Sequence, residues 1–411
     1  MINRLNGQTT RKNSSLRSWF KVILVSVLLL SVSSTCLLSR YSPIFSEENL
    51  EKRSFILSIT STFENENPNG KTWNLSEEER TISLFMNNTW QTVYLLNSSH
   101  PIGKIQKDND GNPTASLILP ASKISAGENL TYHIVYKIIL KPRLLPSISE
   151  NQSGRLDDID EELKKQYCRA NGPWQVELDE LQTLAFKIAG NETNVLSLLK
   201  KFILWIKRNI KYKTYDLPRY PIETVIAKAG DCDDQANLLI VFCRIIGIPA
   251  YLQAGCIYLP QQNSERTYWD GHWILKLTRI GWHGWAVVYI PPWGWLPVDL
   301  TYAPGILSDP INAIRRAAII ITPTFQYVNI TETDYIVSSQ KYREFLVSNG
   351  FKIYEHDAMF EEEKHRETEN LRLPLLHIFV SLSISPNLTE RLFIREDSIR
   401  RVLTGKLGEC L

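Results

Sequence analysis

The sequence predicts an α+β protein, in which a run of strands is followed by helices and then by a second group of strands. Between residues 52 and 145, short apolar or alternating runs are separated by polar, turn-rich segments. An acidic polar stretch then leads into helical patterns, and from Val195 to Ile210 apolar residues recur every three or four positions. Strand-like runs return at Ala250. A chain of 411 residues has room for two or three such domains.

The N-terminal segment predicts membrane anchoring. Residues 1–19 are rich in Lys and Arg, no acidic residue precedes Glu47, and the run from Val22 to Leu38 is apolar or small. This order is typical of a signal anchor with a cytoplasmic basic tail (1–19) and a transmembrane segment (20–39), although removal of the segment as a signal peptide is an alternative. The chain beyond Arg40 is then expected outside the cell, held by a single membrane pass.

Eight N-x-S/T sequences follow the apolar run, which agrees with an extracellular glycoprotein. They begin at Asn74, Asn87, Asn97, Asn129, Asn151, Asn191, Asn329 and Asn387.

Residues 48–148 predict an antiparallel β-sandwich domain, because strands of this length recur at close spacing between turns. No cluster of catalytic residue types occurs there, so we interpret the domain as a spacer or recognition module. Residues 306–411 form a third stretch with mixed α/β signals and no motif that assigns a role.

The sequence GDCDDQANLLIVFCRIIGIPA, from residue 230 to 250, places Cys232 at a predicted helix start. Asp231 is suited to the N-cap and Asp234 to the third helical position, which is a variant of the capping box. Gly247 ends the apolar helical pattern. A helix N-terminus favours a thiolate over a thiol, so this position is typical of a reactive cysteine. A buried structural cysteine is the alternative.

A reactive cysteine needs a base, and His272 and His283 are the two candidates in this region. His283 precedes a strand-like run, and Asp299 is the only acid in the next one, among apolar neighbours that make an unpaired carboxylate costly. If 290–294 form the loop between the two strands, Tyr289 faces Trp295, and His283 and Asp299 share one face as diagonal neighbours. A loop shorter by one residue would separate them.

Four stretches together resemble the transglutaminase-like superfamily: GDCDDQA, GIPAYLQAG, HGWAVVYIPPWGWLPVDLT and the upstream WIKRNIKYKTY. The resemblance implies a papain-like core over residues 155–305, with Cys232 as nucleophile, His283 as base and Asp299 as the residue that orients the histidine. It also implies that the preceding β-domain is like those that accompany such cores in membrane-anchored microbial proteins. Gly284 departs from the more common Ala after the histidine.

The second oxyanion donor stays open. The backbone N–H of Cys232 is one donor by position, and Trp205, Tyr212 or an indole near His283 are unranked candidates for another.

The composition argues against several other functions. A net charge of +2 without a basic aromatic cluster gives no reason to expect a nucleic-acid partner. No Cys or His spacing matches a zinc site, and DCDDQ lacks the ligand alternation of a calcium loop, so we expect neither metal nor cofactor. Of the six cysteines, Cys168, Cys256 and Cys410 are the predicted disulfide partners, whereas Cys232 is expected to be free.

The late tryptophans have two interpretations. They form part of a large core, or they line a groove that shields a thioester and packs the stem of a lysine. They are Trp269, Trp273, Trp282, Trp285, Trp293 and Trp295.

These observations predict a membrane-anchored, outward-facing cysteine enzyme that transfers acyl groups from peptide or side-chain amides of a protein or peptide substrate. Hydrolysis, as in a protease or amidase, is favoured over cross-linking. The alternatives are a catalytically inactive binding or adhesion module with the same fold, and a structural surface protein.

Overall fold

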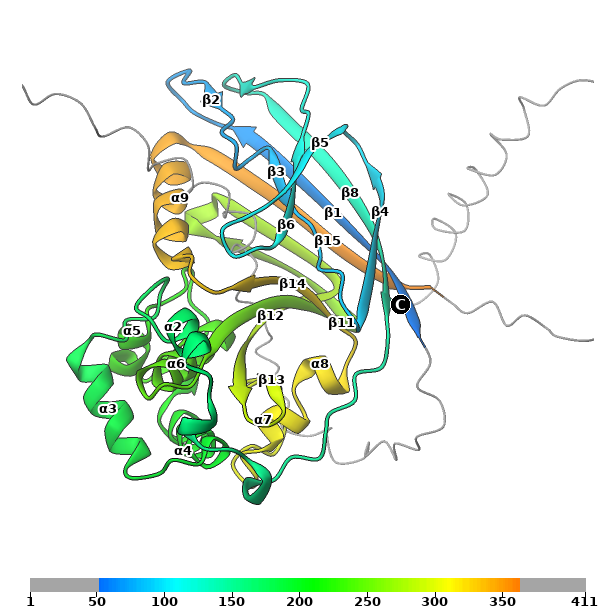
Figure 1. The fold of residues 1–411 in the computed structure, drawn as a ribbon. Coiled ribbons are helices and arrows are strands. Elements are labelled where there is room, and N and C mark those ends of the chain that lie inside the picture. The colour runs from blue at the N-terminus through cyan, green and yellow to red at the C-terminus, as the bar shows by residue number, and fades with distance from the viewer. Residues whose placement is uncertain (1–51, 363–411) are drawn as a thin grey trace, which may run out of the picture. The chain divides into compact units, whose positions relative to one another are not determined.

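The structure, a computed structural model, describes residues 52–362 and has a curled, eight-stranded sheet at its centre (Figure 1). The strand order is β14-β11-β12-β15-β1-β8-β4, and the eighth strand, β13, pairs with β12. The strands are β1 Arg53–Asn65, β4 Gln91–Ser98, β8 Asn129–Leu140, β11 Ala250–Tyr268, β12 Trp273–Ile290, β13 Gly294–Val298, β14 Thr324–Ile330 and β15 Phe351–Glu361.

Three smaller sheets accompany the large one. A three-stranded sheet has the order β3-β6-β5, and β2 pairs with β7 and β9 with β10. Their bounds are β2 Trp73–Asn74, β3 Thr81–Ser83, β5 Ile102–Lys107, β6 Pro113–Leu117, β7 Lys123–Ile124, β9 Lys211–Tyr212 and β10 Ala229–Gly230.

The predicted separate β-sandwich is not what the structure shows. β15 pairs in parallel with β12 and antiparallel with β1, so it joins the early strands to the later ones in a single sheet. The strands β1, β8 and β4 therefore extend the sheet of the core. The stretch after residue 305, to which the sequence assigned no role, supplies β14 and β15 to that sheet. Alternating burial along β1 reflects this arrangement, with Phe55, Leu57 and Phe63 inside.

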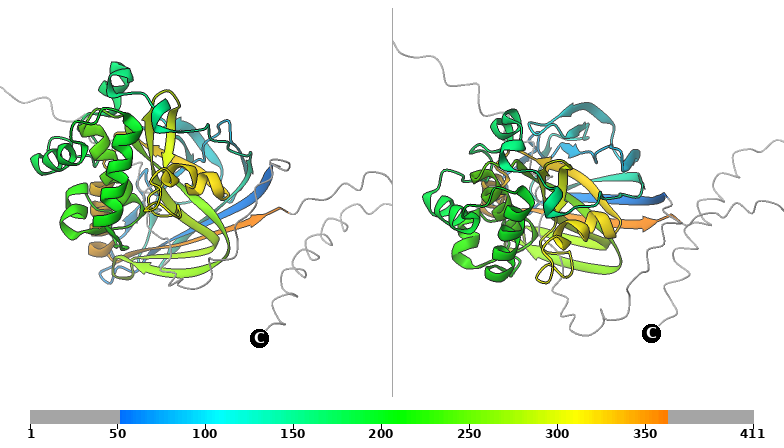
Figure 2. Two further views of the ribbon diagram at one scale, coloured as in Figure 1. Left: turned by 90° about the horizontal axis from the view of Figure 1, so that it is seen from below. Right: turned by 60° about the horizontal axis from the view of Figure 1, so that its bottom comes forward.

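The helices that follow β8 gather at one side of the curled sheet (Figure 2). α6 packs against β11 and β12, and α3, α4 and α5 pack around it. The α-helices are α2 Glu161–Tyr167, α3 Asp179–Ala189, α4 Val195–Asn209, α5 Pro221–Ala227, α6 Cys232–Ile245, α7 Asn312–Arg315, α8 Ala318–Ile321 and α9 Tyr335–Asn349. The 3₁₀ helices are η2 Glu150–Gln152, η3 Leu156–Asp158 and η4 Trp269–Gly271.

The predicted amphipathic helix is confirmed as α4. Its N-cap is Asn194, whose side-chain oxygen accepts a hydrogen bond from the Ser197 N–H at 2.9 Å. The apolar side chains that recur at helical spacing are buried: Val195, Leu198, Leu199, Phe202 and Ile206.

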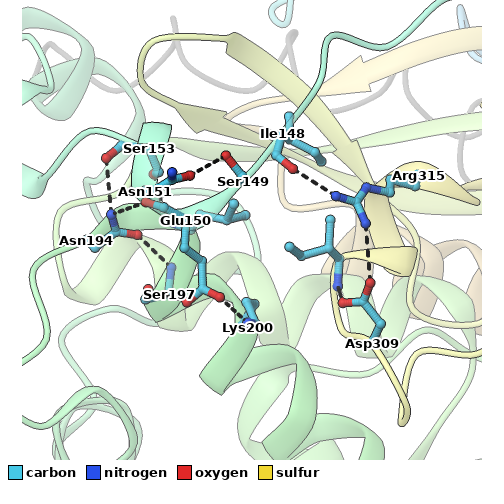
Figure 3. Close-up of polar contacts among 12 residues, drawn as sticks. Ile148, Ser149, Glu150, Asn151, Ser153, Asn194, Ser197, Lys200, Asp309 and Arg315 are labelled. Carbon is cyan, nitrogen blue, oxygen red and sulfur yellow. Dashed lines mark hydrogen bonds and ion pairs between the residues drawn. The ribbon is translucent and has the colours of Figure 1, made fainter.

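The connection between β8 and the helices is tied to the core (Figure 3). Asn194 Nδ2 donates to the backbone oxygens of Glu150 and Ser153 at 2.9 and 3.1 Å. The Glu150 carboxylate accepts hydrogen bonds from Ser197 and Lys200 on α4. Arg315 donates to the Ile148 oxygen at 2.8 Å, which links the same connection to α7. Residues 148–153 are therefore hydrogen-bonded to both the start of α4 and the end of α7.

No helix within residues 52–362 is long and apolar enough to cross a membrane. The predicted tail (1–19) and anchor (20–39) lie outside the described residues, as do Cys36, Asn387 and Cys410.

The late tryptophans mostly belong to the core. Trp269, Trp273, Trp282 and Trp285 are buried, and only Trp293 and Trp295 are partly exposed. The predicted lysine-binding aromatic groove is therefore not formed in this structure, because the side chains that would line it pack inward.

The cysteines within the described residues are all free: Cys168, Cys232, Cys243 and Cys256. Cys232 is thus a free thiol, as predicted, whereas the prediction that Cys168 and Cys256 form disulfides is wrong in this structure. Cys243 and Cys256 are completely buried among apolar side chains.

Candidate active site

α6 begins at Cys232, the position predicted from the sequence. Asp234 Oδ2 accepts a hydrogen bond from the Asp231 backbone N–H at 3.2 Å, which is one half of the predicted capping box. The Asp231 side chain faces the backbone of the third helical residue in turn, which completes the capping-box arrangement that the sequence predicts. Gly247, with φ of +86°, follows the last turn of the helix and allows the chain to turn back into β11.

The β12–β13 hairpin has the register that brings His283 and Asp299 together. Tyr289 pairs with Trp295, as predicted, and Ile290 pairs with Gly294. The His283 ring donates from Nε2 to Asp299 Oδ2 at 2.8 Å. Both side chains are essentially removed from solvent.

Asp299 is held by donors on several sides. The Ala318 N–H donates to Oδ2 at 3.0 Å, and the N–H groups of Thr301 and Tyr302 donate to Oδ1 at 3.1 and 3.0 Å. Burial alone would raise the pKa of Asp299, but the charge and hydrogen bond of His283 and the backbone donors lower it below its ordinary value. Asp299 is therefore ionised and fixed in place, which suits it to orient a histidine.

Cys232 lies beside the same strand. The backbone N–H of Gly284, the residue next to His283, is near enough to the Cys232 sulfur to oppose the rise of the thiol pKa. A Cβ at Gly284 would lie 3.2 Å from the Asp233 Cβ, so glycine allows the start of α6 to approach β12 closely. His283 Nδ1, the ring nitrogen not used by Asp299, has no hydrogen-bond partner among the described residues. The histidine can therefore accept a proton at Nδ1 while Asp299 holds Nε2.

The predicted activation of Cys232 by the helix is opposed by burial. Burial raises the pKa of the Cys232 thiol well above its ordinary value, the nearby Asp231 and Asp233 act in the same direction, and the Gly284 N–H acts against them. Cys232 is 1% exposed. The described conformation is thus a closed one with a neutral thiol.

The part of the chain that contains Cys232, His283 and Asp299 is similar to known proteins. Residues 182–300, which include Cys232, His283 and Asp299, match the family model of the transglutaminase-like superfamily. Residues 182–300 form a transglutaminase-like core. No curated protein matches the chain.

Among solved structures, the chain is similar to a candidate cysteine protease from Cytophaga hutchinsonii, with 18% identity and a TM-score of 0.44 over 80% of this chain and 95% of the other. It is also similar to the periplasmic domain of TgpA from Pseudomonas aeruginosa bound to ethylmercury, with 16% identity and a TM-score of 0.28 over 60% of this chain and 90% of the other. A third similar structure is that of a candidate protease from Parabacteroides distasonis, with 10% identity and a TM-score of 0.24 over 62% of this chain and 64% of the other.

Three aspartates lie within two residues of Cys232 at the start of α6. Asp233 Oδ2 accepts a hydrogen bond from the Tyr335 hydroxyl at 2.7 Å, and Asp234 Oδ1 accepts one from the Arg219 N–H at 2.9 Å. Burial, and then the neighbouring carboxyls, raise the pKa of Asp231 well above its ordinary value. Asp231 therefore takes up a proton more readily than an exposed aspartate, and in its protonated form it does not repel a Cys232 thiolate.

The same residues are a possible metal-ligand set within the described part of the chain. Asp231, Cys232 and Asp233 bring one ligand atom each within 4.8 Å of one another. A metal ion bound there would occupy the nucleophile itself.

The other candidates from the sequence lie in different environments. His272 is not the base, because its ring donates to the Phe351 oxygen at 2.8 Å and holds the start of β15. The Trp285 indole is already used by Gln253 Oε1 at 3.1 Å. Trp205 packs edge-on against Phe242 on α6, and Tyr212 is 39% exposed. None of these positions decides the second oxyanion donor.

Sequence reasoning missed several contributors to the site. Lys207 on α4 is close enough to Asp299 for that carboxylate to oppose the lowering of the lysine pKa by burial. The Tyr302 ring lies 6.1 Å from the His283 ring, and the Ala318 N–H binds Asp299. A backbone donor has no signature in a single sequence. Lys207 does have one, since it lies between apolar positions of an amphipathic helix.

Proposed function

We propose that this chain is a cysteine enzyme that transfers acyl groups from peptide or side-chain amides through a thioester on Cys232. The observation that carries the proposal is the 2.8 Å His283–Asp299 hydrogen bond, which leaves the other ring nitrogen of His283 without a partner among the described residues. Cys232 lies at the start of α6, which packs against the strand that carries His283. This combination offers a nucleophile, a base and an orienting carboxylate at one place.

The reaction proceeds in two acyl-transfer steps. His283 Nδ1 takes the Cys232 proton as the sulfur attacks the amide carbonyl, and the same proton passes to the leaving amine when the C–N bond breaks. Water then loses a proton to His283, attacks the thioester, and releases the carboxylic acid with the Cys232 thiol restored. Asp299 stabilises the imidazolium in both steps without giving up its own charge.

Because Cys232 is buried, substrate binding must open the site before the first step. Opening also admits water, which lowers the cost of the thiolate relative to the closed conformation.

Hydrolysis is favoured over cross-linking. A cross-linker needs a subsite that shields the thioester and packs a lysine stem, and the tryptophans suited to that role are buried in the core. Water needs no such subsite.

The proposed location is the outer face of a cell membrane, with the N-terminal segment as anchor. Its support is the basic flank and apolar run of the sequence. Most asparagines of the glycosylation sequences are exposed, and so are open to modification: Asn74, Asn87, Asn97, Asn129, Asn151 and Asn191.

The test is to incubate the chain with a protein mixture and a labelled primary amine. We expect new peptide termini and no covalent label, both dependent on Cys232. Cys243→Ala is the matched control, because Cys243 is a free, buried thiol on the same helix. Label that depends on Cys232 would replace hydrolysis by cross-linking. Neither new termini nor label would support the inactive binding module instead.

A further inference from the structure

A pocket of about 210 Å³ lies where the ends of β1, β8 and β4 meet α8. Its apolar wall includes Trp90, Leu140, Ile319 and Ile320. The cation Arg143 also lines it. The volume is below the usual range for drug-sized ligands, so the pocket fits a small molecule or the end of a longer one.

Arg143 lines this pocket and forms no ion pair with another residue in the 52–362 range. Its Nη1 is buried and has no hydrogen-bond partner among the described residues. Its guanidinium lies 5.7 Å from the centre of the Trp90 ring, and burial lowers its pKa. The other arginine of the lining, Arg53, differs because it forms two hydrogen bonds with Glu361, at 2.6 and 2.7 Å. Arg143 is half-buried, and leaving its buried Nη1 without an acceptor among the described residues is costly, so an anion in the pocket would remove that cost.

The charge and the walls define the chemical class of the ligand. Lys141 also lines the pocket but is exposed, so solvent screens its charge, and the half-buried Arg143 is the lining cation that a ligand would neutralise most effectively. One such guanidinium balances a single negative charge, which fits a carboxylate better than a phosphate monoester of charge near −2. The apolar wall beside it fits a short hydrocarbon stem. A peptide C-terminal residue and a short fatty acid share this chemistry.

The wall of the pocket reaches the proposed catalytic pair. α8 contributes Ile319 and Ile320 to the wall, and its first residue, Ala318, donates its N–H to Asp299 at 3.0 Å. Thr322 also lines the pocket, and its hydroxyl lies 3.1 Å from the Tyr302 hydroxyl. The Tyr302 N–H in turn donates to Asp299 at 3.0 Å.

We propose that this pocket binds a monocarboxylate on a short apolar stem, with its charge on Arg143, and that the occupant holds α8 in the position that orients Asp299. The binding does not depend on the proposed acyl transfer. The effect on Asp299 does depend on the proposed function, because it matters for catalysis only through the role that Asp299 has there.

Binding is tested by calorimetry on the full chain with hexanoate, N-acetyl-leucine and hexylamine. We expect at least one carboxylate to bind and the amine not to. Arg143→Gln should weaken binding by about tenfold or more, because a charge-assisted hydrogen bond is lost. Lys141→Gln is the control, since Lys141 lines the same pocket but is exposed. Ile320→Phe, which fills the pocket without changing its charge, should also weaken binding.

Which carboxylate binds identifies the source: N-acetyl-leucine indicates a peptide end and hexanoate a fatty acid. No binding by either, equal binding of hexylamine, or an unchanged affinity in folded Arg143→Gln would overturn the site. The coupling is read separately, from the rate of Cys232 alkylation followed by peptide mapping. We expect the bound carboxylate to change that rate severalfold in the wild type and not in Arg143→Gln. An unchanged rate at saturation would overturn the coupling.

Discussion

The hydrogen bond between His283 and Asp299 leaves one ring nitrogen of His283 open for proton transfer with Cys232 in the proposed mechanism. His283 Nε2 is bound to Asp299, so only Nδ1 can serve the cysteine. The tautomer is therefore set by a carboxylate whose lowered pKa keeps it ionised. Each of the three side chains has a different task, and replacing each should have a different consequence.

We predict graded losses of activity in this set. Cys232→Ala should abolish turnover, and His283→Ala should cost nearly as much because proton transfer is lost. Asp299→Asn should retain residual activity, about 10²–10⁴-fold below the wild type, because Asp299 orients the imidazole and does not react. Measured rates of amide hydrolysis check this, with His272→Ala as the control. Loss of activity in His272→Ala with retention in His283→Ala would contradict the assignment of the base.

The acids around Cys232 should affect its reactivity with pH. Removing the carboxyl in Asp231→Asn takes away a group that raises the Cys232 pKa whenever it is ionised. We therefore expect the pH profile of Cys232 alkylation to shift to lower pH in this variant. The shift is measured by iodoacetamide labelling and peptide mapping, with Asp157→Asn, an exposed aspartate, as the control. A profile that does not move, or moves to higher pH, would contradict this prediction.

At the scale of elements, the turn between β5 and β6 connects the early strands to the end of β14. Asp110 Oδ1 accepts hydrogen bonds from the N–H groups of Thr331 and Glu332, and Asn112 Nδ2 donates to the Asn329 oxygen. Asp108 lies in the same turn, and burial raises its pKa to about 7. The turn thus contains a carboxyl that titrates near neutral pH.

We predict that this turn loosens as the pH rises through about 7. A carboxyl whose pKa is raised by folding contributes stability below its ordinary pKa, and this is lost as the pH passes the folded value. Hydrogen exchange of residues 105–113 at pH 6 and pH 8, corrected for intrinsic rates, should show less protection at pH 8. Asp108→Asn should remove the difference. Equal protection at both pH values in the wild type would contradict the prediction.

The N-cap of α4 gives a second prediction at this scale. Asn194→Ala removes the acceptor for the Ser197 N–H and the donors to Glu150 and Ser153. We expect it to lower the free energy of unfolding by about 1–2 kcal/mol. Urea denaturation measures this. Asn209→Ala, at the other end of α4, is the control, and a larger effect there would contradict the assigned role of the cap.

At the scale of the whole molecule, the large sheet joins the early strands to the core through β15. Asp357 on β15 is buried and accepts a hydrogen bond from the Trp282 indole at 2.7 Å, one residue before His283. Burial, and then Glu355, raise its pKa well above the ordinary value. The strand that unites the sheet therefore contributes to the core a carboxyl whose protonated form is favoured by burial.

We predict that the protein loses stability as the pH rises above the ordinary pKa of an aspartate. Asp231, Asp234 and Asp357 all have raised pKa values, so the folded state binds more protons than the unfolded chain and its free energy of unfolding falls with increasing pH. Asp357→Asn keeps an acceptor for Trp282 and should reduce this dependence. Urea denaturation at increasing pH tests it. A steeper dependence in Asp357→Asn would contradict the proposed protonation state.

The local parts of this protein follow from the sequence alone. The amphipathic pattern of α4, the start of α6 at Cys232 and the β12–β13 register were predicted because they depend on neighbours within a few residues, through helical spacing, capping and strand alternation. Because His283 and Asp299 lie on one hairpin, their meeting could be predicted as well.

Only the tertiary structure decided the rest. β15 lies between β12 and β1, although β1 and β15 are separated by most of the described chain, and no local pattern specifies such a pairing. Burial is likewise a property of the whole molecule. It turned the predicted thiolate into a neutral thiol and decided between the two interpretations of the tryptophans in favour of the core. The reason is that desolvation depends on what packs around a group and not on its neighbours in the chain.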